Sequence, residues 1–250
     1  MGSMKALSLA AAVAAAVAVA ACRNRAPGDA ATPGPGSPPP AAAPAAAPVG
    51  EVAAPALEMA AGDDPAAAPS PVDLRGIGHD LGNASARVTV VEFADFGCPY
   101  CGQFAKDVWP AIRKEYVETG KVRWKYVPFV MGMFPNGDEA ARAGECAAGQ
   151  GEPAFWAMAD LLFQGQREWK SSRDPGALFA RYAGELRLNA ATFGACFRAD
   201  AARARTTAAN DASGRLGVRV TPTFFVNGEK LEGALPLEDF RMVLRQAGAR

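Results

Sequence analysis

The sequence predicts an α/β fold in the order β-α-β, an all-helical insertion, then β-β-α. A β-branched, almost continuously apolar run at residues 87–94 has the pattern of a central strand covered on both faces. A second strand pattern follows at 121–127. Near the C-terminus, an Asn-Gly pair between two short runs is typical of a β-hairpin.

The first block places a helix between its two strands. Apolar residues recur at helical spacing from residue 102 to 119, and Gly120 is expected to end the helix. Pro110 lies inside this helix and is expected to kink it. The strand at 121–127 then alternates polar and apolar residues, as a strand with one face in the core does.

The helical insertion is predicted at about residues 137–216. Asp138 is expected to cap its first helix, and Glu152 with the proline after it opens a second. Asp174 also precedes a proline, which is the arrangement of an N-cap followed by proline at the first helical position. Asn189 is expected to cap a fourth helix that continues to about residue 214. The aromatic faces of these helices are expected to form core, not a cofactor site.

The C-terminal block closes the fold. Residues 223–226 and 229–232 are predicted strands, joined by the Asn227-Gly228 turn. Pro236 is expected to start a last helix with its apolar face turned inward.

Residues 1–22 have the pattern of an export signal. Lys5 supplies a short positive region, and residues 6–21 form an uncharged Ala/Val/Leu run that is short for a helix across a ~30 Å hydrocarbon core. The run ends in Val-Ala-Ala-Cys, which resembles a bacterial lipobox and predicts a lipid anchor on Cys22. Ordinary cleavage after Ala20 is the alternative.

Residues 23–70 consist mostly of Ala, Pro and Gly, without any aromatic residue. Such a stretch cannot bury enough apolar surface to offset its ordering entropy, so a disordered tether is expected. Tolerated low-complexity sequence without a role is the alternative. Residues 71–250 form the expected folded domain.

Charge and motif content exclude several classes of partner. The 26 basic and 26 acidic residues balance, and no cluster of basic residues indicates a nucleic-acid-binding surface. The sequence also lacks a glycine-rich phosphate loop framed by a strand and a helix, so no nucleotide, flavin or haem cofactor is expected.

The five cysteines divide into three groups. Cys22 ends the export signal, Cys98 and Cys101 form a Cys-x-x-Cys pair, and Cys146 and Cys196 stand alone. One anchor, one catalytic pair and one bridge would use all five, which suits a chain that leaves the reducing cytosol. We therefore expect a structural disulfide between Cys146 and Cys196, with two buried free thiols as the alternative.

The Cys-x-x-Cys pair fits redox chemistry better than a metal site. Structural zinc needs two further ligands, and His79 is the only histidine, expected at the surface of a Gly/Asp-rich stretch. Cys98 is predicted at a helix N-terminus, where free N–H groups and the positive dipole end lower a cysteine pKa from about 8.5 to ~3.5–7.5. Cys101, one turn later, is placed to attack a mixed disulfide at Cys98. Pro99 suits the first helical position because it leaves no N–H unpaired.

Two segments far apart in the chain carry distinctive patterns. Residues 90–101 spell VVEFADFGCPYC, and residues 217–228 spell GVRVTPTFFVNG. Together they resemble the DsbA-like thiol–disulfide oxidoreductases, a family with a thioredoxin-like fold and a helical insertion. The resemblance extends over about residues 78–248. It implies disulfide exchange with protein thiols through the Cys98-Pro99-Tyr100-Cys101 motif.

The resemblance also implies roles for single residues. Cys98 matches the nucleophile and Cys101 the resolving cysteine, while the dipeptide between them tunes the stability of the reduced form. Pro222 matches a cis-proline that faces the active site, with Thr221 before it. An ordinary trans proline at a strand start is the alternative.

Glu92 matches a buried acid beneath the active site. There it could relay a proton to or from Cys101. A solvent-facing strand residue is the alternative. Lys125 is a candidate partner for Glu92 across neighbouring strands, or else an exposed lysine on the sheet.

The leading functional hypothesis is an oxidant that donates its disulfide to reduced exported proteins. The second is an isomerase or reductase that acts on misoxidised proteins and is kept reduced by a membrane redox partner, because Thr221 also resembles reductive and isomerising relatives. The third is a non-catalytic binding module with Tyr100 and Phe129 at the active-site rim. The expected location is the periplasmic side of a bacterial cell envelope, with the chain anchored through Cys22.

Overall fold

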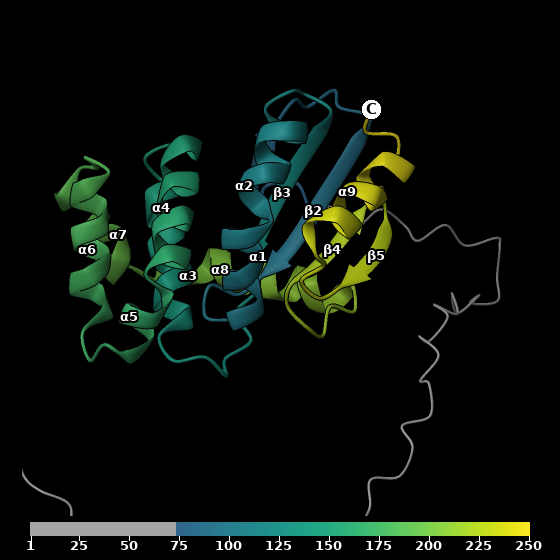
Figure 1. Cartoon of the computed structure of the whole chain (residues 1–250). Helices are drawn as coiled ribbons and strands as arrows, with labels where there is room; N and C mark the ends of the chain where they lie inside the picture. Colours follow the sequence, from purple (N-terminus) through teal and green to yellow (C-terminus); the bar gives the residue numbers. More distant parts are fainter. Residues whose placement is uncertain (1–73) are drawn as a thin grey trace, which may run out of the picture. The chain divides into compact units, whose positions relative to one another are not determined.

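The computed structural model describes residues 74–250 (Figure 1). The predicted export signal, Cys22 and the tether at 23–70 lie outside these described residues. Within 74–250, no helix combines the length and the apolar character that a membrane span needs.

A five-stranded mixed sheet lies at the centre of the fold, in the order β1-β3-β2-β4-β5. Strands β2 and β3 pair in parallel, whereas the other neighbours are antiparallel. Their bounds are β1 His79–Gly82, β2 Val88–Ala94, β3 Val122–Pro128, β4 Thr223–Val226 and β5 Glu229–Glu232. The predicted α/β class is confirmed, and the edge strand β1 is an addition that the sequence pattern did not predict.

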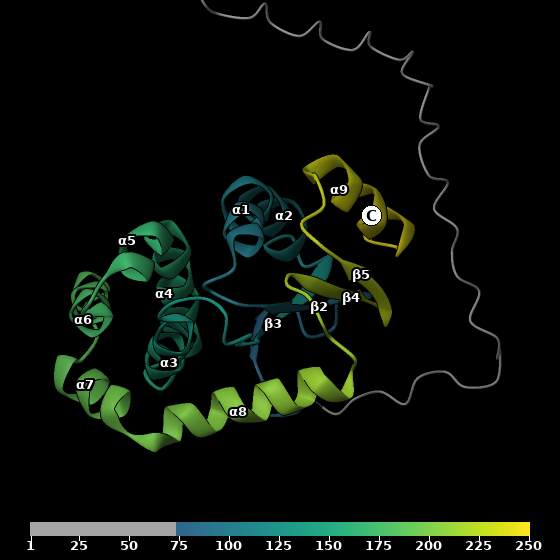
Figure 2. The same ribbon diagram turned by 90° about the horizontal axis from the view of Figure 1, so that it is seen from below.

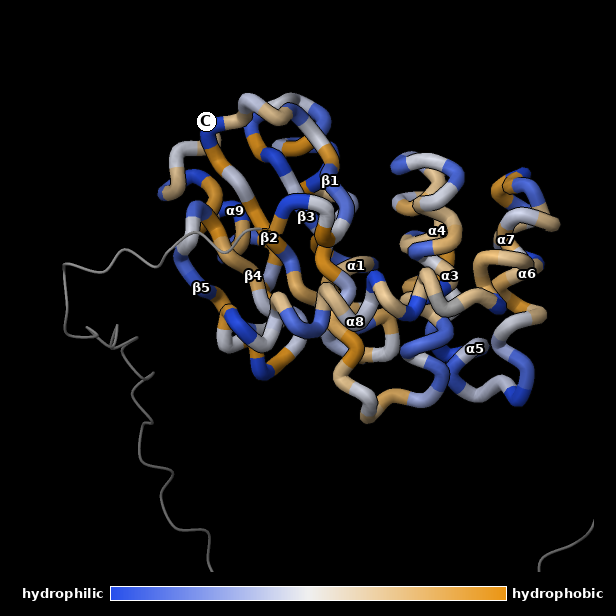
Figure 3. The backbone as a smooth tube through the Cα atoms, turned by 180° about the vertical axis from the view of Figure 1, so that it is seen from behind, coloured by the Kyte–Doolittle hydropathy of each residue, from blue (hydrophilic) through white to orange (hydrophobic). Residues whose placement is uncertain are grey.

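The edge strand β5 is polar, with the sequence Glu-Lys-Leu-Glu, and Figure 3 shows it largely hydrophilic. Charged residues on an edge strand discourage pairing with another chain. The central strand β2 is buried along most of its length instead.

The connection between β2 and β3 differs from the predicted single helix at 102–119. It consists of α1 Pro99–Asp107, α2 Trp109–Ile112 and the π-helical turn η1 Arg113–Val117. The helical path is interrupted at Val108, and a new helix, α2, begins with Pro110 in its first turn. The kink expected at Pro110 takes the form of a break at Val108, because proline lacks the N–H for an interior helix bond but fits a helix start.

The helical insertion and α9 surround the sheet (Figure 2). Helices α1, α2 and α9 cover one face, α8 runs along the other, and α3 to α7 lie to the side. The bounds are α3 Gly137–Ala148, α4 Glu152–Gln164, α5 Gln166–Ser171, α6 Pro175–Glu185, α7 Ala190–Arg198, α8 Asp200–Arg215 and α9 Leu237–Gln246.

Two of the expected helix caps are present. The side-chain oxygens of Asp174 and Asn189 accept hydrogen bonds from backbone N–H groups in the first turns of α6 and α7. Asp138 instead lies in the first turn of α3, after Asn136 in the left-handed conformation. The predicted fourth helix is two helices, because the backbone is extended at Ala199.

Aromatic side chains form the core between the sheet and its covering helices. Phe104, Trp124, Phe224 and Phe240 are fully buried and their rings lie in mutual contact, with the centroids of Phe104 and Phe224 4.7 Å apart. The aromatic face of α4 is buried as expected. This packing fixes α1, and with it the Cys-x-x-Cys motif, against the sheet.

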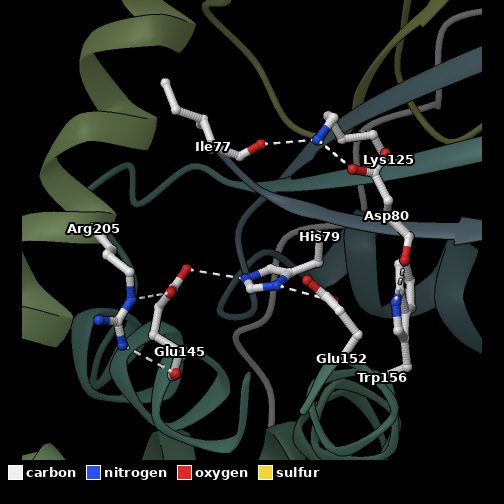
Figure 4. A network of polar contacts seen from close by, with 8 residues as sticks. All are labelled: Ile77, His79, Asp80, Lys125, Glu145, Glu152, Trp156 and Arg205. Atoms are coloured by element: carbon white, nitrogen blue, oxygen red, sulfur yellow. Dashed lines mark hydrogen bonds and ion pairs between the residues drawn. The ribbon is translucent and has the colours of Figure 1, made fainter. Parts of the chain in front are cut away.

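His79 was expected at the surface and is instead buried, so that prediction was wrong. Its ring stacks on Phe155 with centroids 3.5 Å apart, and Nε2 lies 3.1 Å from Glu145 Oε1 (Figure 4). Arg205 of α8 donates to the other oxygen of Glu145 at 2.6 Å, and Glu152 Oε2 lies 3.3 Å from His79 Nδ1. The network joins β1 to α3, α4 and α8. This network was not predicted from the sequence, because no residue pattern indicated strand β1.

Candidate active site

Cys98 is the N-cap of α1, at the end of the loop that follows β2. Pro99 occupies the first turn of the helix, as the residue pattern predicts. The Thr221–Pro222 peptide bond is cis, and the Cys98 Sγ lies 3.3 Å from the carbonyl oxygen of Thr221. The structure thus brings together two motifs that lie more than 100 residues apart in the chain.

The environment of Cys98 favours its thiolate. Hydrogen bonding with Cys101 contributes most, and bonds with Thr221 and with the N–H groups of Cys101 and Tyr100 add to it. These interactions outweigh burial and lower the pKa of Cys98 to about 6. Thiolate is the nucleophilic form of cysteine, so this environment favours nucleophilic chemistry at Cys98 near neutral pH.

Cys101 has the opposite environment. It is fully buried, and burial raises its pKa well above the ordinary value, with further increases from Cys98 and the charge of Glu92. The pair therefore holds one ionised and one protonated sulfur near neutral pH. This is the asymmetry that a nucleophile and a resolving thiol require.

Glu92 lies on β2 with only 5% of its surface exposed. Its Oε2 accepts a hydrogen bond from Trp124 Nε1 at 3.0 Å. Burial raises the pKa of Glu92 to about 8, although the Trp124 bond lowers it in part. A carboxyl group in this state can give or accept a proton close to neutral pH.

Lys125 does not pair with Glu92. It faces Asp80 at 2.8 Å and the carbonyl oxygen of Ile77 at 3.1 Å (Figure 4). Successive residues of a strand point to opposite faces, and Glu92 is in register with Tyr126 rather than with Lys125. The candidate pair of Lys125 with Glu92 therefore does not form, because Lys125 is in register with Val91 instead.

Two residues of the helical insertion donate hydrogen bonds to the active-site loop. The sequence analysis did not identify either of them. Gln166 Nε2 of α5 donates to the carbonyl oxygens of Phe96 at 2.6 Å and Cys98 at 2.8 Å. Lys170 Nζ donates to the carbonyl oxygen of Gly97 at 2.6 Å. No local pattern marks these residues, because their role depends on where α5 packs.

Asp95 is a third residue that was missed. It is almost fully buried and accepts hydrogen bonds from the N–H groups of Gly97 and Met131, both at 2.8 Å. Burial raises the pKa of Asp95, and those two bonds and Lys170 lower it in part. An Asp two residues before a glycine in a turn is typical of an Asx turn, so this role could have been predicted.

Exposed apolar side chains belong to the segments around Cys98. Tyr100 exposes 64% of its surface, Met133 66% and Val220 42%. Phe129, expected beside Tyr100 at the rim, packs instead against the buried cluster that includes Phe93 on the α8 side of the sheet.

Cys146 of α3 and Cys196 of α7 form a disulfide, with Cα atoms 5.6 Å apart. The bond lies within the helical insertion. Within residues 74–250, no cluster of three or more His, Cys, Asp or Glu side chains is placed to hold a metal ion.

The fold is similar to that of solved structures of DsbA and BdbD. The structure superposes on oxidised BdbD from Bacillus subtilis with a TM-score of 0.64, at 24% identity over 70% of this chain and 94% of that one. A family model described as Thioredoxin matches residues 76–246, and the chain belongs to the thioredoxin family.

Curated relatives also match about two thirds of the chain. Disulfide bond formation protein D of Bacillus subtilis is 26% identical over 170 residues, covering 66% of this chain and 75% of that protein. The Na(+)/H(+) antiporter NhaA 3 of Salinispora tropica is 39% identical over 173 residues, which cover 68% of this chain. The chain spans about a quarter of the length of that antiporter.

Proposed function

We propose that the protein is an exported thiol–disulfide oxidoreductase that oxidises protein thiols with a disulfide between Cys98 and Cys101. The observation that carries this proposal is the asymmetry of the pair. The pKa of Cys98 is lowered to about 6, whereas that of Cys101 is raised well above its ordinary value.

The reaction proceeds in two exchanges. A substrate thiolate attacks Cys98 Sγ, the bond between Cys98 and Cys101 breaks, and Cys101 leaves as a thiolate that takes up a proton. A second substrate thiolate then attacks the substrate sulfur of the mixed disulfide and releases the Cys98 thiolate. The substrate loses two electrons and the protein gains them.

The depressed pKa of Cys98 favours the oxidising direction. A thiol of low pKa leaves faster, so the second exchange is accelerated. The same stabilisation of the thiolate lowers the free energy of the reduced protein, which makes its disulfide a stronger oxidant.

The surroundings of Cys98 suit an unfolded substrate chain. Backbone groups beside cis-Pro222 can pair with an extended segment in β fashion. Exposed Tyr100, Met133 and Val220 offer apolar contacts without a deep pocket. Such a surface suits the binding of many different substrate sequences rather than a single one.

A disulfide isomerase or reductase is the second candidate. A pKa of about 6 for Cys98 lies closer to the value of ≈7 in thioredoxin than to ≈3.5 in DsbA. Such an enzyme would act on misoxidised proteins and be returned to the dithiol by a membrane redox partner.

We infer that the protein works on the periplasmic side of a bacterial cell envelope. The N-terminal pattern supports export with lipidation at Cys22, residues 23–70 serving as the tether of the domain at 71–250. The Cys146–Cys196 bond supports this location, since structural disulfides persist in oxidising compartments.

The reduction potential separates the two candidates. The purified protein would be equilibrated with glutathione buffers and its thiols counted by alkylation and mass measurement. A potential near −120 mV, as in DsbA, supports the oxidant; a potential near −270 mV, as in thioredoxin, contradicts it. Cys98→Ala is the control and should oxidise no reduced ribonuclease A. If ribonuclease refolds equally with wild type and this variant, the exchange proposal itself is wrong.

A further inference from the structure

Glu92 must exchange protons although it is cut off from solvent. In the proposed reaction, Cys101 leaves as a buried thiolate, and the Glu92 carboxyl, whose charge acts on it, can supply the proton. Glu92 then holds a charge at a site where 5% of its surface is exposed. A buried carboxylate is costly, so turnover needs a path by which a proton returns.

An inner cavity of about 20 Å³ lies beside Glu92. Glu92 of β2 and Asp160 of α4 both line it, together with aromatic side chains of α1, α2, α4 and β3. The volume suits one water molecule, and the two carboxyl groups supply polar partners for it.

An outer pocket of about 490 Å³ lies between α1, α2 and α4. It shares four lining residues with the inner cavity, namely Ala105, Trp109, Asp160 and Phe163. Exposed side chains also line the outer pocket, so it meets solvent. Asp160 therefore belongs to both spaces, with 42% of its side chain exposed.

We propose that Glu92 exchanges its proton with solvent through a water in the inner cavity, and that Asp160 positions this water and passes the proton between it and solvent. The inference rests on the proposed exchange at Cys98 and Cys101. Asp160 is a positioning residue, because it acts through water and does not touch the reacting sulfurs.

The proton balance is simple. Glu92 gives its proton to the Cys101 thiolate, which leaves a Glu92 carboxylate and a neutral thiol. The water in the inner cavity then protonates Glu92 and recovers a proton from solvent by way of Asp160. No electron moves in these steps, and no further reactant is needed.

The charged groups around both carboxyls fit this role. Burial raises the pKa of Asp160, and Arg113 of η1, at 3.6 Å, lowers it in part. Lys106 and Glu118 also line the outer pocket. A carboxyl group with a raised pKa gives up and regains a proton more readily near neutral pH.

On the inner side, Glu92 accepts a bond from Trp124, lines the cavity together with Tyr126, and its charge acts on Cys101. Tyr126 stays neutral, because burial and the charge of Glu92 raise its pKa well above the ordinary value. In the part of the chain that the structure describes, no Lys, Arg or His lines the inner cavity to hold Glu92 ionised.

The test is a single-turnover reaction of the oxidised full-length protein with dithiothreitol at pH 6 to 8, in H₂O and in D₂O. Asp160→Asn keeps the size of the side chain but cannot pass a proton. We expect it to slow the release of Cys101 about tenfold, less than the ~10²-fold or more of a direct proton donor, and to enlarge the solvent isotope effect. The reduction potential of the variant should equal that of wild type, because the proton route affects the rate and not the free-energy difference between the oxidised and reduced protein.

Arg113→Gln is the matched control. It removes the ion pair with Asp160 but leaves the carboxyl group, and its rate should stay within about twofold of wild type. Ala159→Val fills the inner cavity without altering a carboxyl and should slow the reaction as Asp160→Asn does.

These outcomes distinguish a failure of the proton route from a failure of the proposed function. If wild type exchanges and Asp160→Asn matches its rate and isotope effect, the proton route is wrong. If Asp160→Asn shifts the potential or slows the reaction equally at every pH, its role is structural and the inference is again overturned. If wild type itself fails to exchange with dithiothreitol, the proposed function fails first.

Discussion

Gln166 donates its side-chain N–H to the backbone carbonyl oxygen of Cys98 at 2.8 Å. A second bond from the same nitrogen reaches the carbonyl oxygen of Phe96 at 2.6 Å. The helical insertion therefore does more than enlarge the domain, because α5 fixes the loop that carries Cys98. Gly102 leaves the room for this contact: a Cβ there would lie 2.6 Å from Gln166 Oε1.

Gln166→Ala should destabilise the domain by about 1–3 kcal/mol. The change removes the side-chain donor from the buried carbonyl oxygens of Phe96 and Cys98. Cys98 keeps its hydrogen bond from the Gly102 N–H at 3.0 Å, so the cost falls on Phe96, and one unsatisfied group costs ≈1–3 kcal/mol. Urea unfolding of the oxidised protein measures the effect. Gln164→Ala, at an exposed site two residues earlier, is the control and should stay within about 0.5 kcal/mol of wild type. Equal midpoints for both variants would show that the loop does not depend on α5.

The Cys98 thiol should ionise with a midpoint near pH 6. Thiolate absorbance at 240 nm, followed in the reduced protein and in Cys98→Ala, measures it. Because the pKa of the folded state is depressed, ionisation stabilises the reduced protein fully above the unfolded-state pKa of about 8.5. That contribution is lost as the pH falls through about 6. A midpoint at pH 8 or above would contradict the electrostatic basis of the proposed function.

Glu92→Gln should stabilise the protein, and more so as the pH rises. Wild-type Glu92 has a raised pKa, so its contribution is fully present below about pH 4.5 and is lost as the pH rises towards about 8. The glutamine cannot ionise, and its carbonyl can still accept from Trp124. The gain in unfolding free energy should grow by up to about 1.4 kcal/mol per pH unit across that window.

Urea unfolding of the oxidised Glu92→Gln variant at pH 4, 6 and 8 checks this window. Glu118→Gln, at an exposed position, is the matched control and should show no such slope. A pH-independent difference between the Glu92→Gln variant and wild type would mean that Glu92 ionises in the folded state as it does in the unfolded chain.

Local sequence patterns predicted much of this fold. The apolar run of β2, the Asn227-Gly228 hairpin and the caps at Asp174 and Asn189 depend on residues close together in the chain. Such features follow from backbone conformation and hydrogen bonding within a few residues. The helix start at Cys98 likewise depends only on residues close together in the chain.

What the sequence did not reveal depends on contacts between distant elements. His79 is buried only because β1 pairs with β3 and packs beside α3 and α4. Gln166 reaches the active-site loop only because α5 lies against it. Lys125 was one candidate partner for Glu92, and this pair does not form because pairing depends on strand register.

Removing the disulfide in the insertion should lower stability without abolishing exchange. The bond spans 50 residues, and restriction of the unfolded chain by a loop of that length corresponds to about 4 kcal/mol in the entropy model. The double variant Cys146→Ala with Cys196→Ala should lose about that much in urea unfolding, and its Cys98 should still titrate as in wild type. Mass analysis of the digested, non-reduced wild type should show a 146–196 linkage. Alkylatable thiols at both positions would contradict the bond, and a lost Cys98 thiolate in the double variant would show that the insertion disulfide supports the active site itself.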